Sequence, residues 1–254
     1  MSPSKFVWHE LMTTDTKAAE AFYTKVVGWQ AADSGMPGGV YTIFSTGSTR
    51  VAGLMGMPPD AQAQGAPPSW IGYIGVDKIH TYVEKVKAAG GTIIRDPEDI
   101  PGVGRFAVAK DPHGAVFALF STDYPPQPSP APGTPGVVGW NELYAGDLNS
   151  AWAFYSELFG WTKADAMDMG PHGIYQLFST GEMPDGGMMT KMPQTPVPCW
   201  LYYFNVETVD AAVDRINQAG GKIVNGPMEV PGGSWIVQAL DPQGAMFAVV
   251  APKR

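Results

Sequence analysis

Apolar and polar residues alternate along residues 6–11, FVWHEL, and this period of two predicts a β-strand with one buried face. A helical period follows. Asp15 is the candidate N-cap of the helix, with Thr14 as the alternative. The helix then has an apolar stripe at Ala18, Phe22 and Val26. Gly28 is expected to end it, because glycine readily adopts the left-handed conformation of a helix C-terminus.

Shorter apolar runs fill the rest of the first half. Two strands are expected at residues 40–45 and 50–55, joined by a Thr-Gly turn, and another at 70–76. A second helix follows with apolar positions at Ile79, Val83 and Val86, and it ends at a Gly-Gly pair. RFAVAK and AVFALF, joined by Asp-Pro-His-Gly, predict a closing hairpin. This half therefore reads as strand-helix-strand-strand and then strand-helix-three strands, which are two similar units.

The second half of the chain repeats the first. FVWHELMTTDTKAAEAFYTKVVGW at 6–29 corresponds to VGWNELYAGDLNSAWAFYSELFGW at 138–161, with equivalent residues 132 positions apart. Further pairs are FSTG at 44–47 and 178–181, AGGTIIRDP at 89–97 and AGGKIVNGP at 219–227, and KDPHGAVFALF at 110–120 and LDPQGAMFAVV at 240–250. Residues 123–136, DYPPQPSPAPGTPG, predict an extended proline-rich linker. Two homologous domains are therefore expected, at residues 1–122 and 137–254.

Composition and charge narrow the class of protein. A hydrophobic content of 44% with 16% charged residues is typical of a soluble globular chain. The net charge of −8 and the absence of a Lys/Arg cluster argue against a nucleic acid or an anionic membrane as partner. Cys199 is the only cysteine, so no internal disulfide can form. With no signal-peptide pattern and no membrane-spanning run, a cytoplasmic protein is expected.

Three motifs, in the same order in each half, carry a family resemblance. They are D-x6-FY-x4-GW after the opening strand, a strand and helix ending in AGG, and a closing DP-x-G-x-x-F hairpin. Together they resemble the vicinal oxygen chelate superfamily of glyoxalase I, bleomycin-resistance proteins and extradiol dioxygenases, and in particular its bacterial tandem two-domain members. The resemblance implies an α+β fold in which each domain pairs two βαβββ units, with curled mixed sheets around a small-molecule cleft. It also implies, for the enzymes, a divalent metal held by His and Glu side chains.

The metal-ligand positions that the resemblance implies are apolar in both halves. The opening-strand ligand would fall at Trp8 and Trp140, whereas His9 points to the other face of its strand. The other positions fall on Ile71, Leu201, Ala118 and Ala248, and near 53–55 and 187–189. One displaced histidine cannot supply the several N or O donors that such an ion requires. Neither a metal nor another cofactor is therefore expected.

An aromatic cleft is predicted in place of the metal site. Trp8 shares a strand face with Glu10 and Met12, and Trp140 shares one with Glu142 and Tyr144. Alternation on the two central strands adds Ile71, Tyr73 and Gly75 in the first half and Leu201, Tyr203 and Asn205 in the second. Apolar walls with a few polar groups are typical of a small-molecule site. The tryptophans either stack on a planar or cationic ligand or simply fill the volume of a lost metal.

Glu10 and Glu142 allow two interpretations. A carboxylate among Trp and Tyr side chains is a candidate general base, but it is equally a structural acceptor of hydrogen bonds. Its presence at equivalent positions of both halves favours the structural role. Arg105 has Trp235 as its counterpart, which predicts that only one cleft can hold an anionic group. His172 lies in a Gly-Pro loop, from which it could reach a cleft.

Three functions remain open from the sequence. The favoured one is metal-free binding of a small aromatic or heteroaromatic molecule. The alternative is a glyoxalase- or dioxygenase-like enzyme, either metal-dependent through ligands at unmapped positions, such as His9 or His172, or metal-free with Glu10 or Glu142 as general base. The last is a purely structural or interaction role with a filled cleft. A monomer with pseudo-two-fold symmetry and a homodimer are both compatible with the tandem repeat.

Overall fold

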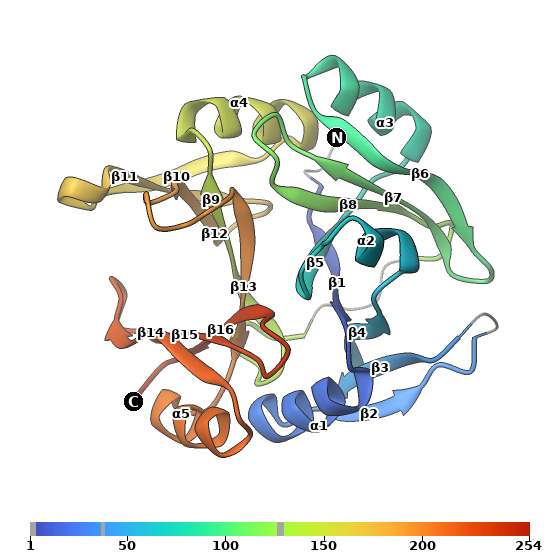
Figure 1. Cartoon of the computed structure of the whole chain (residues 1–254). Coiled ribbons are helices and arrows are strands. Elements are labelled where there is room, and N and C mark those ends of the chain that lie inside the picture. The colour runs from blue at the N-terminus through green and yellow to red at the C-terminus, as the bar shows by residue number, and fades with distance from the viewer. Residues whose placement is uncertain (1–3, 37–38, 126–129) are drawn as a thin grey trace. The chain divides into compact units, whose positions relative to one another are not determined.

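The structure is a computed structural model that describes residues 4–36, 39–125 and 130–254 (Figure 1). The middle of the predicted linker, residues 126–129, lies outside the described residues. The first repeat contains two modules, each with one strand, one helix and three more strands. Module 1 consists of β1 (Phe6–Thr13), α1 (Thr16–Val27), β2 (Gln30–Asp33), β3 (Tyr41–Thr46) and β4 (Thr49–Gly56). Module 2 follows the short α2 (Pro59–Ala63) and consists of β5 (Ser69–Gly75), α3 (Ile79–Ala88), β6 (Thr92–Ile100), β7 (Gly104–Lys110) and β8 (Val116–Ser121).

The second repeat has the same order of elements. Module 3 consists of β9 (Val138–Ala145), α4 (Leu148–Phe159), β10 (Thr162–Asp168), the 3-10 turn η1 (Gly170–His172), β11 (Ile174–Ser179) and β12 (Pro184–Thr190). Module 4 consists of β13 (Cys199–Asn205), α5 (Val209–Gln218), β14 (Lys222–Glu229), β15 (Trp235–Leu240) and β16 (Met246–Ala251). In every module the first and last strands pair in parallel and the remaining pairs are antiparallel. The predicted α+β fold of tandem βαβββ modules is confirmed.

The strands and helices expected from periodicity are present, and the structure adds β2, the short helix α2 and the 3-10 turn η1. The residue pattern does not reveal β2, whose sequence QAAD is short, lies at the edge of its sheet and lacks an apolar alternation. The predicted helix ends are found. The Asp15 carboxylate accepts a hydrogen bond from the Ala18 N–H at 3.0 Å, and Gly28 has φ 87°. Asp147 and Gly160 cap α4 in the same way.

The compact units of the structure cut across the sequence repeats. Among the described residues, unit 1 contains 4–7, 71–125 and 140–200, which is essentially modules 2 and 3. Unit 2 contains 8–36, 39–70, 130–139 and 201–254, essentially modules 1 and 4. Within unit 1, α3 contacts α4, and within unit 2, α1 lies beside α5 (Figure 1). Each unit therefore takes one module from each repeat.

Buried hydrogen bonds between the two most repeated motifs hold each unit together. In unit 2, the Tyr23 hydroxyl of the FY motif donates to Asp241 Oδ2 at 3.1 Å and accepts from Trp70 Nε1 at 2.9 Å. In unit 1, Tyr155 donates to Asp111 Oδ2 at 3.4 Å and accepts from the indole of Trp200. Both aspartates belong to DP-x-G turns and also accept backbone N–H groups of their own turn. The tyrosine of each repeat thus binds the turn of the other.

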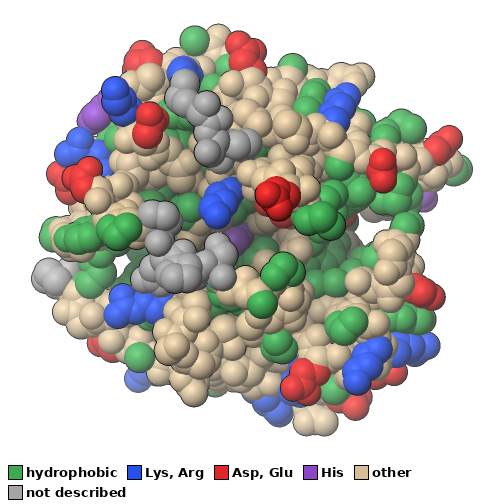
Figure 2. All heavy atoms as spheres, turned by 180° about the vertical axis from the view of Figure 1, so that it is seen from behind, with side chains coloured by type: hydrophobic (Ala, Val, Ile, Leu, Met, Phe, Trp, Pro, Cys, Tyr) green, Lys and Arg blue, Asp and Glu red, His purple; other side chains and the backbone are tan. Residues whose placement is uncertain are grey.

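No helix in the described part of the chain is long and apolar enough to cross a membrane. Acidic and basic side chains are interspersed over the face drawn in Figure 2. Among the described residues on that face, no basic stripe of the kind that follows a nucleic-acid backbone is seen.

Candidate functional site

Trp8, Glu10 and Tyr41, together with Gly53, form what we call the first cluster. The indole N–H of Trp8 donates to the Tyr41 hydroxyl at 3.0 Å, and that hydroxyl donates to Glu10 Oε2 at 2.7 Å. Strand register brings these residues together, because Glu10 on β1 lies opposite Gly53 on β4, which in turn lies opposite Ile43, two residues after Tyr41 on β3. The result is a chain of hydrogen bonds across three neighbouring strands, ending on a carboxylate.

Gly53 makes room for the Tyr41 ring. A Cβ atom at this position would lie 2.0 Å from the Tyr41 hydroxyl oxygen and 3.1 Å from Trp8 Nε1. Real Cβ atoms do not approach other atoms so closely, so any side chain here would displace the tyrosine. The glycine is therefore part of the cluster, although it contributes no functional group.

The second repeat contains the same arrangement. Trp140 Nε1 donates to the Tyr175 hydroxyl at 2.8 Å, and that hydroxyl is hydrogen-bonded to Glu142. Gly187 lies opposite Glu142, and a Cβ atom on it would lie 2.4 Å from the Tyr175 ring. We call Trp140, Glu142, Tyr175 and Gly187 the second cluster. It belongs to unit 1, whereas the first cluster belongs to unit 2.

The two cluster tyrosines are neutral hydrogen-bond donors. Burial, and then the negative charge of Glu10, raise the pKa of Tyr41 far above its usual value. Burial and Glu142 raise the pKa of Tyr175 in the same way. Neither hydroxyl can therefore serve as a base near neutral pH. In each cluster the group able to accept a proton or a ligand's hydrogen bond is the carboxylate.

Exposure distinguishes the two clusters. Tyr41 of the first cluster and Met55 beside the cluster are half-buried. Their counterparts Tyr175 and Met189 are buried, with exposed fractions of 9% and 4%. The tryptophans of both clusters are half-buried and both glutamates are buried, so the first cluster is the more accessible one at its tyrosine and the neighbouring methionine.

The structure places two other predicted site residues on the cluster faces and pairs the predicted residues of the central strands with one another. Met12 lies opposite Met55 on the face of the first cluster, and Tyr144 follows Glu142 on the face of the second. Tyr73 lies opposite Ala118 within unit 1, and Tyr203 lies opposite Ala248 within unit 2. Ile71, Leu201 and Asn205 are buried, and Gly75 is half-buried. Within unit 2, the Tyr203 hydroxyl also accepts a hydrogen bond from Gln238 at 2.6 Å.

Arg105 lies elsewhere than the sequence predicts. It shares the strand face of Ala107 on β7, whereas Tyr73 and Ala118 share the opposite face with Val108. Its guanidinium forms a bidentate ion pair with Asp99, at 2.6 and 2.9 Å, and donates to His80 on α3 at 2.9 Å. This pair lowers the pKa of the Asp99 carboxyl. The charge of Arg105 is therefore engaged at the surface.

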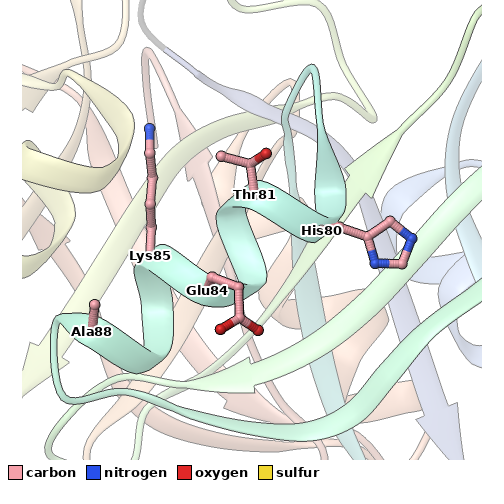
Figure 3. A pocket seen from close by; sticks show the side chains of 5 residues that line it. All are labelled: His80, Thr81, Glu84, Lys85 and Ala88. Atoms are coloured by element: carbon pink, nitrogen blue, oxygen red, sulfur yellow. The ribbon is translucent and has the colours of Figure 1, made fainter.

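A shallow hollow on α3, beside this ion pair, does not form a convergent site (Figure 3). Its lining side chains all come from α3, and Figure 3 shows His80, Glu84 and Lys85 pointing in different directions. A binding site requires polar groups that converge on one ligand position. We assign no function to this hollow.

The residues present do not fit a metal of the family type. His9 is 7% exposed and lies edge-on against the Tyr202 ring at 4.7 Å, on the other face of β1 from Trp8 and Glu10. Within the described ranges, no group of three or more His, Cys, Asp or Glu side chains lies close enough to hold a metal ion. The positions that the resemblance assigns to ligands carry Trp, Ile, Leu, Ala, Gly and Met side chains. Glu10 and Glu142 instead end hydrogen-bond chains from tyrosine.

Cys199 is a neutral thiol near the second cluster. Burial, and then the charge of Glu142, raise the pKa of this thiol to about 11. At neutral pH the sulfur is therefore protonated and a poor nucleophile, as expected of a small packed residue.

Sequence reasoning missed the cluster tyrosines, although the sequence contained a signal for them. Tyr41 and Tyr175 stand at the same distance before the repeated FSTG segments, in YTIFSTG and YQLFSTG. A repeated aromatic at equal spacing predicts a shared contact. The glycines opposite them carry no such signal, since their role depends on a close approach between strands.

The family model and the similar proteins all point to the same family. The model of the Glyoxalase/Bleomycin resistance protein/Dioxygenase superfamily matches residues 5–119 and 137–249. A Mycobacterium tuberculosis protein named "Putative glyoxylase CFP32" is 35% identical over 248 residues, covering 96% of this chain and 94% of that protein. The anthracycline biosynthesis protein DnrV of Streptomyces peucetius is 33% identical over 262 residues, covering 98% and 94%.

Solved structures show the same fold at low sequence identity. The Mn(II)-bound glyoxalase from Novosphingobium aromaticivorans superposes with a TM-score of 0.66 at 16% identity, covering 99% of this chain and 82% of that one. The 2,3-dioxygenase LapB from a Pseudomonas species gives 0.67 at 15% identity, covering 99% and 93%. With the family model matched in both halves and full-length relatives above 30% identity, this chain is a tandem member of the glyoxalase/bleomycin resistance protein/dioxygenase superfamily.

Proposed function

We propose that the chain binds a small planar aromatic molecule, without a metal ion, at the first cluster. The observation that carries this proposal is the hydrogen-bond chain from Trp8 through Tyr41 to Glu10. It fixes the orientation of the indole ring and of the carboxylate before a ligand arrives, which lowers the entropy cost of binding. Two relatives named for anthracycline biosynthesis, a pathway to polycyclic aromatic compounds, support a planar ligand.

Each group of the cluster has a distinct role in this proposal. The ligand ring stacks on Trp8, with the flexible side chains of Met12 and Met55 against its edge. A phenolic hydroxyl or ring N–H of the ligand donates to the Glu10 carboxylate, whose two oxygens accept several hydrogen bonds. Tyr41 holds the carboxylate in place as a neutral donor.

The proposal is tested with 2,6-dihydroxyanthraquinone, a planar probe with two phenolic donors, by calorimetric titration of the full chain. Trp8→Leu is expected to weaken binding about tenfold or more, because a large aromatic contact is lost. Trp140→Leu, the matched variant in the less exposed cluster, is expected to bind as the wild type does. Equal affinity in wild type and Trp8→Leu would contradict the proposal.

Metal content is measured on the same preparation. Protein purified without an affinity tag or chelator is expected to contain far less than one mole of transition metal per chain. Probe binding is expected to be unchanged by dialysis against zinc, nickel, manganese or ferrous iron. Stoichiometric metal that is lost in His9→Ala would point to a metalloenzyme instead.

An enzyme that uses Glu10 as general base is the second candidate. It is favoured by the carboxylate lying beside two half-buried aromatic side chains, Trp8 and Tyr41. Glu10→Gln separates the two candidates. An enzyme would lose turnover of its substrate while keeping its affinity, whereas a binding protein shows no turnover in either form.

A further inference from the structure

A cavity of about 270 Å³ lies in the second repeat, beside the start of α4. Ile174 and Gln176 on β11 line it, and Tyr175 between them belongs to the second cluster. Successive side chains of a strand point to opposite faces of the sheet. The cavity is therefore on the other side of the sheet from the second cluster and is a separate place in the fold.

Two side chains that can donate hydrogen bonds to an anion, Lys163 and His172, line this cavity. Lys163 Nζ lies 5.3 Å from the centre of the Trp152 ring, and His172 stands at the end of the η1 turn. In the part of the chain that the structure describes, neither side chain forms an ion pair with a carboxylate. An anionic group between them would gain charge-assisted hydrogen bonds from both.

The side-chain amide of Gln176 completes the lining. Gln176 is 6% exposed, and its Nε2 donates to the carbonyl oxygens of Ala164 and Leu177, each at 2.9 Å. Within the described chain its Oε1 accepts no hydrogen bond. Among the described residues, this oxygen is not one of the fully buried side-chain oxygens without a partner, so it is accessible and can receive an N–H or O–H from a ligand.

The equivalent place in the first repeat has different chemistry. Glu20 takes the position of Trp152, and Thr42 takes that of Gln176. The Thr42 hydroxyl donates to Glu20 Oε2 at 3.0 Å, so these two polar side chains satisfy each other. Lys163 has Ala31 as its counterpart. The cationic and aromatic lining therefore belongs to the second repeat alone.

We propose that this cavity binds a small planar carboxylate that carries a hydrogen-bond donor. The carboxylate lies between Lys163 and His172, the ring packs against Trp152, and the donor binds Gln176 Oε1. The volume is just below the usual range for drug-sized ligands and suits a compound with one ring. Asp147 also lines the cavity, but its Oδ1 accepts from the Ser150 N–H, and its charge is opposed by the positive end of α4. This site does not depend on the function proposed for the first cluster.

The probe is 2-aminobenzoate, which combines one ring, a carboxylate and an N–H donor. It is titrated into the full isotope-labelled chain and followed by NMR. The amides of 148–152 and 172–176 and the Trp152 indole are expected to shift together. The neutral analogue 2-aminobenzamide is expected to bind about tenfold or more weakly, because it lacks the charge that Lys163 recognises.

Two exposed lysines provide a matched pair of variants. Lys163→Gln is expected to weaken 2-aminobenzoate binding about tenfold or more, and Lys222→Gln is expected to leave it unchanged. Equal affinity in Lys163→Gln and wild type would overturn the proposal, as would equal affinity for the two probes. It would also be overturned if up to about 10 mM probe produced no shift, or shifts near Trp8 instead of Trp152.

Discussion

The two clusters share a hydrogen-bond pattern but differ in access to solvent. Both link a tryptophan, a tyrosine and a glutamate over a glycine. Tyr41 and Met55 remain half-buried, while Tyr175 and Met189 are buried. The two repeats therefore share the hydrogen-bonded Trp, Tyr and Glu side chains, and they differ in how deeply the tyrosine and the neighbouring methionine are buried.

The helix-covered faces of the same sheets differ in chemistry as well. The first repeat fills this place with a Thr42–Glu20 hydrogen bond, whereas the second opens a cavity beside Trp152 and Lys163. Because the Thr42 hydroxyl already donates to the Glu20 carboxylate, that donor is not available to a ligand. Under the two proposals above, the first repeat binds its ligand at its cluster and the second repeat binds its ligand in its cavity.

The largest expected effect comes from breaking both clusters through their glycines. Gly53→Ala is expected to lower the free energy of unfolding by about 2–3 kcal/mol, because the new Cβ overlaps the Tyr41 hydroxyl. Gly187→Ala is expected to cost as much through Tyr175. Gly56→Ala on the same strand as Gly53 is the control, since its Cβ would meet only Thr16, at 4.0 Å, and the expected change is within about 0.5 kcal/mol. Equal denaturant midpoints for Gly53→Ala and Gly56→Ala would show that Tyr41 moves aside freely.

A smaller change in the free energy of unfolding is expected when the buried tyrosine of either FY motif, Tyr23 or Tyr155, is replaced by Phe. Tyr23→Phe is expected to cost about 2 kcal/mol of unfolding free energy, because it removes a donor to Asp241 and the acceptor of the Trp70 indole. Tyr155→Phe is expected to cost about 1 kcal/mol, since its bond to Asp111 is longer, at 3.4 Å. Chemical denaturation of both variants measures the difference. The reverse order of costs would contradict this comparison of the two units.

The charge of Glu142 is tested through the reactivity of the nearby Cys199 thiol. Glu142→Gln is expected to speed alkylation of Cys199 about threefold or more at mildly alkaline pH, because the nearby negative charge helps to raise the thiol pKa to about 11. Glu10→Gln is the control, because Glu10 is not among the charged groups that shift the pKa of Cys199. An unchanged alkylation rate in Glu142→Gln would mean that this carboxylate is not charged near the thiol.

The smallest effect concerns tyrosine ionisation. Tyr23, Tyr41 and Tyr175 have pKa values raised from 10.0, chiefly by burial. Because the folded pKa exceeds the unfolded one, these hydroxyls stabilise the fold fully below pH 10, and this contribution is lost as the pH rises through the folded pKa. Ultraviolet titration of tyrosinate is expected to show at least three of the ten tyrosines still protonated at about pH 11. Tyr41→Phe is expected to remove one of these late groups, and ionisation of all ten together would contradict the burial.

The fold could be predicted from sequence because its signals are local and occur twice. Asp15 and Gly28 mark the ends of α1 by capping chemistry that depends only on neighbouring residues. Strand alternation also predicted that His9 and Glu10 point to opposite faces, as the structure shows. The edge strand β2 escaped notice because its side chains pack on too little to impose a pattern.

The site could be predicted only in part, because its contacts depend on register between distant strands. Glu10 and Trp8 were found from the opening strand alone. Tyr41 and Gly53 join them through pairings of β1 with β4 and of β4 with β3, which no local pattern fixes. Arg105 was misplaced because its ion pair with Asp99 depends on the hairpin of β6 and β7. Nor does the sequence reveal that Tyr23 binds an aspartate of the other repeat.

The hydrogen bonds between a tyrosine of one repeat and an aspartate of the other have a consequence when the chain is cut in two. A break in the proline-rich segment would leave Tyr23 on one fragment and Asp241 on the other, and it would separate Tyr155 from Asp111 in the same way. Each fragment would carry half of both units and the whole of neither. Co-expressed halves should therefore reassemble and purify as a complex, which would make this chain a natural starting point for a split reporter.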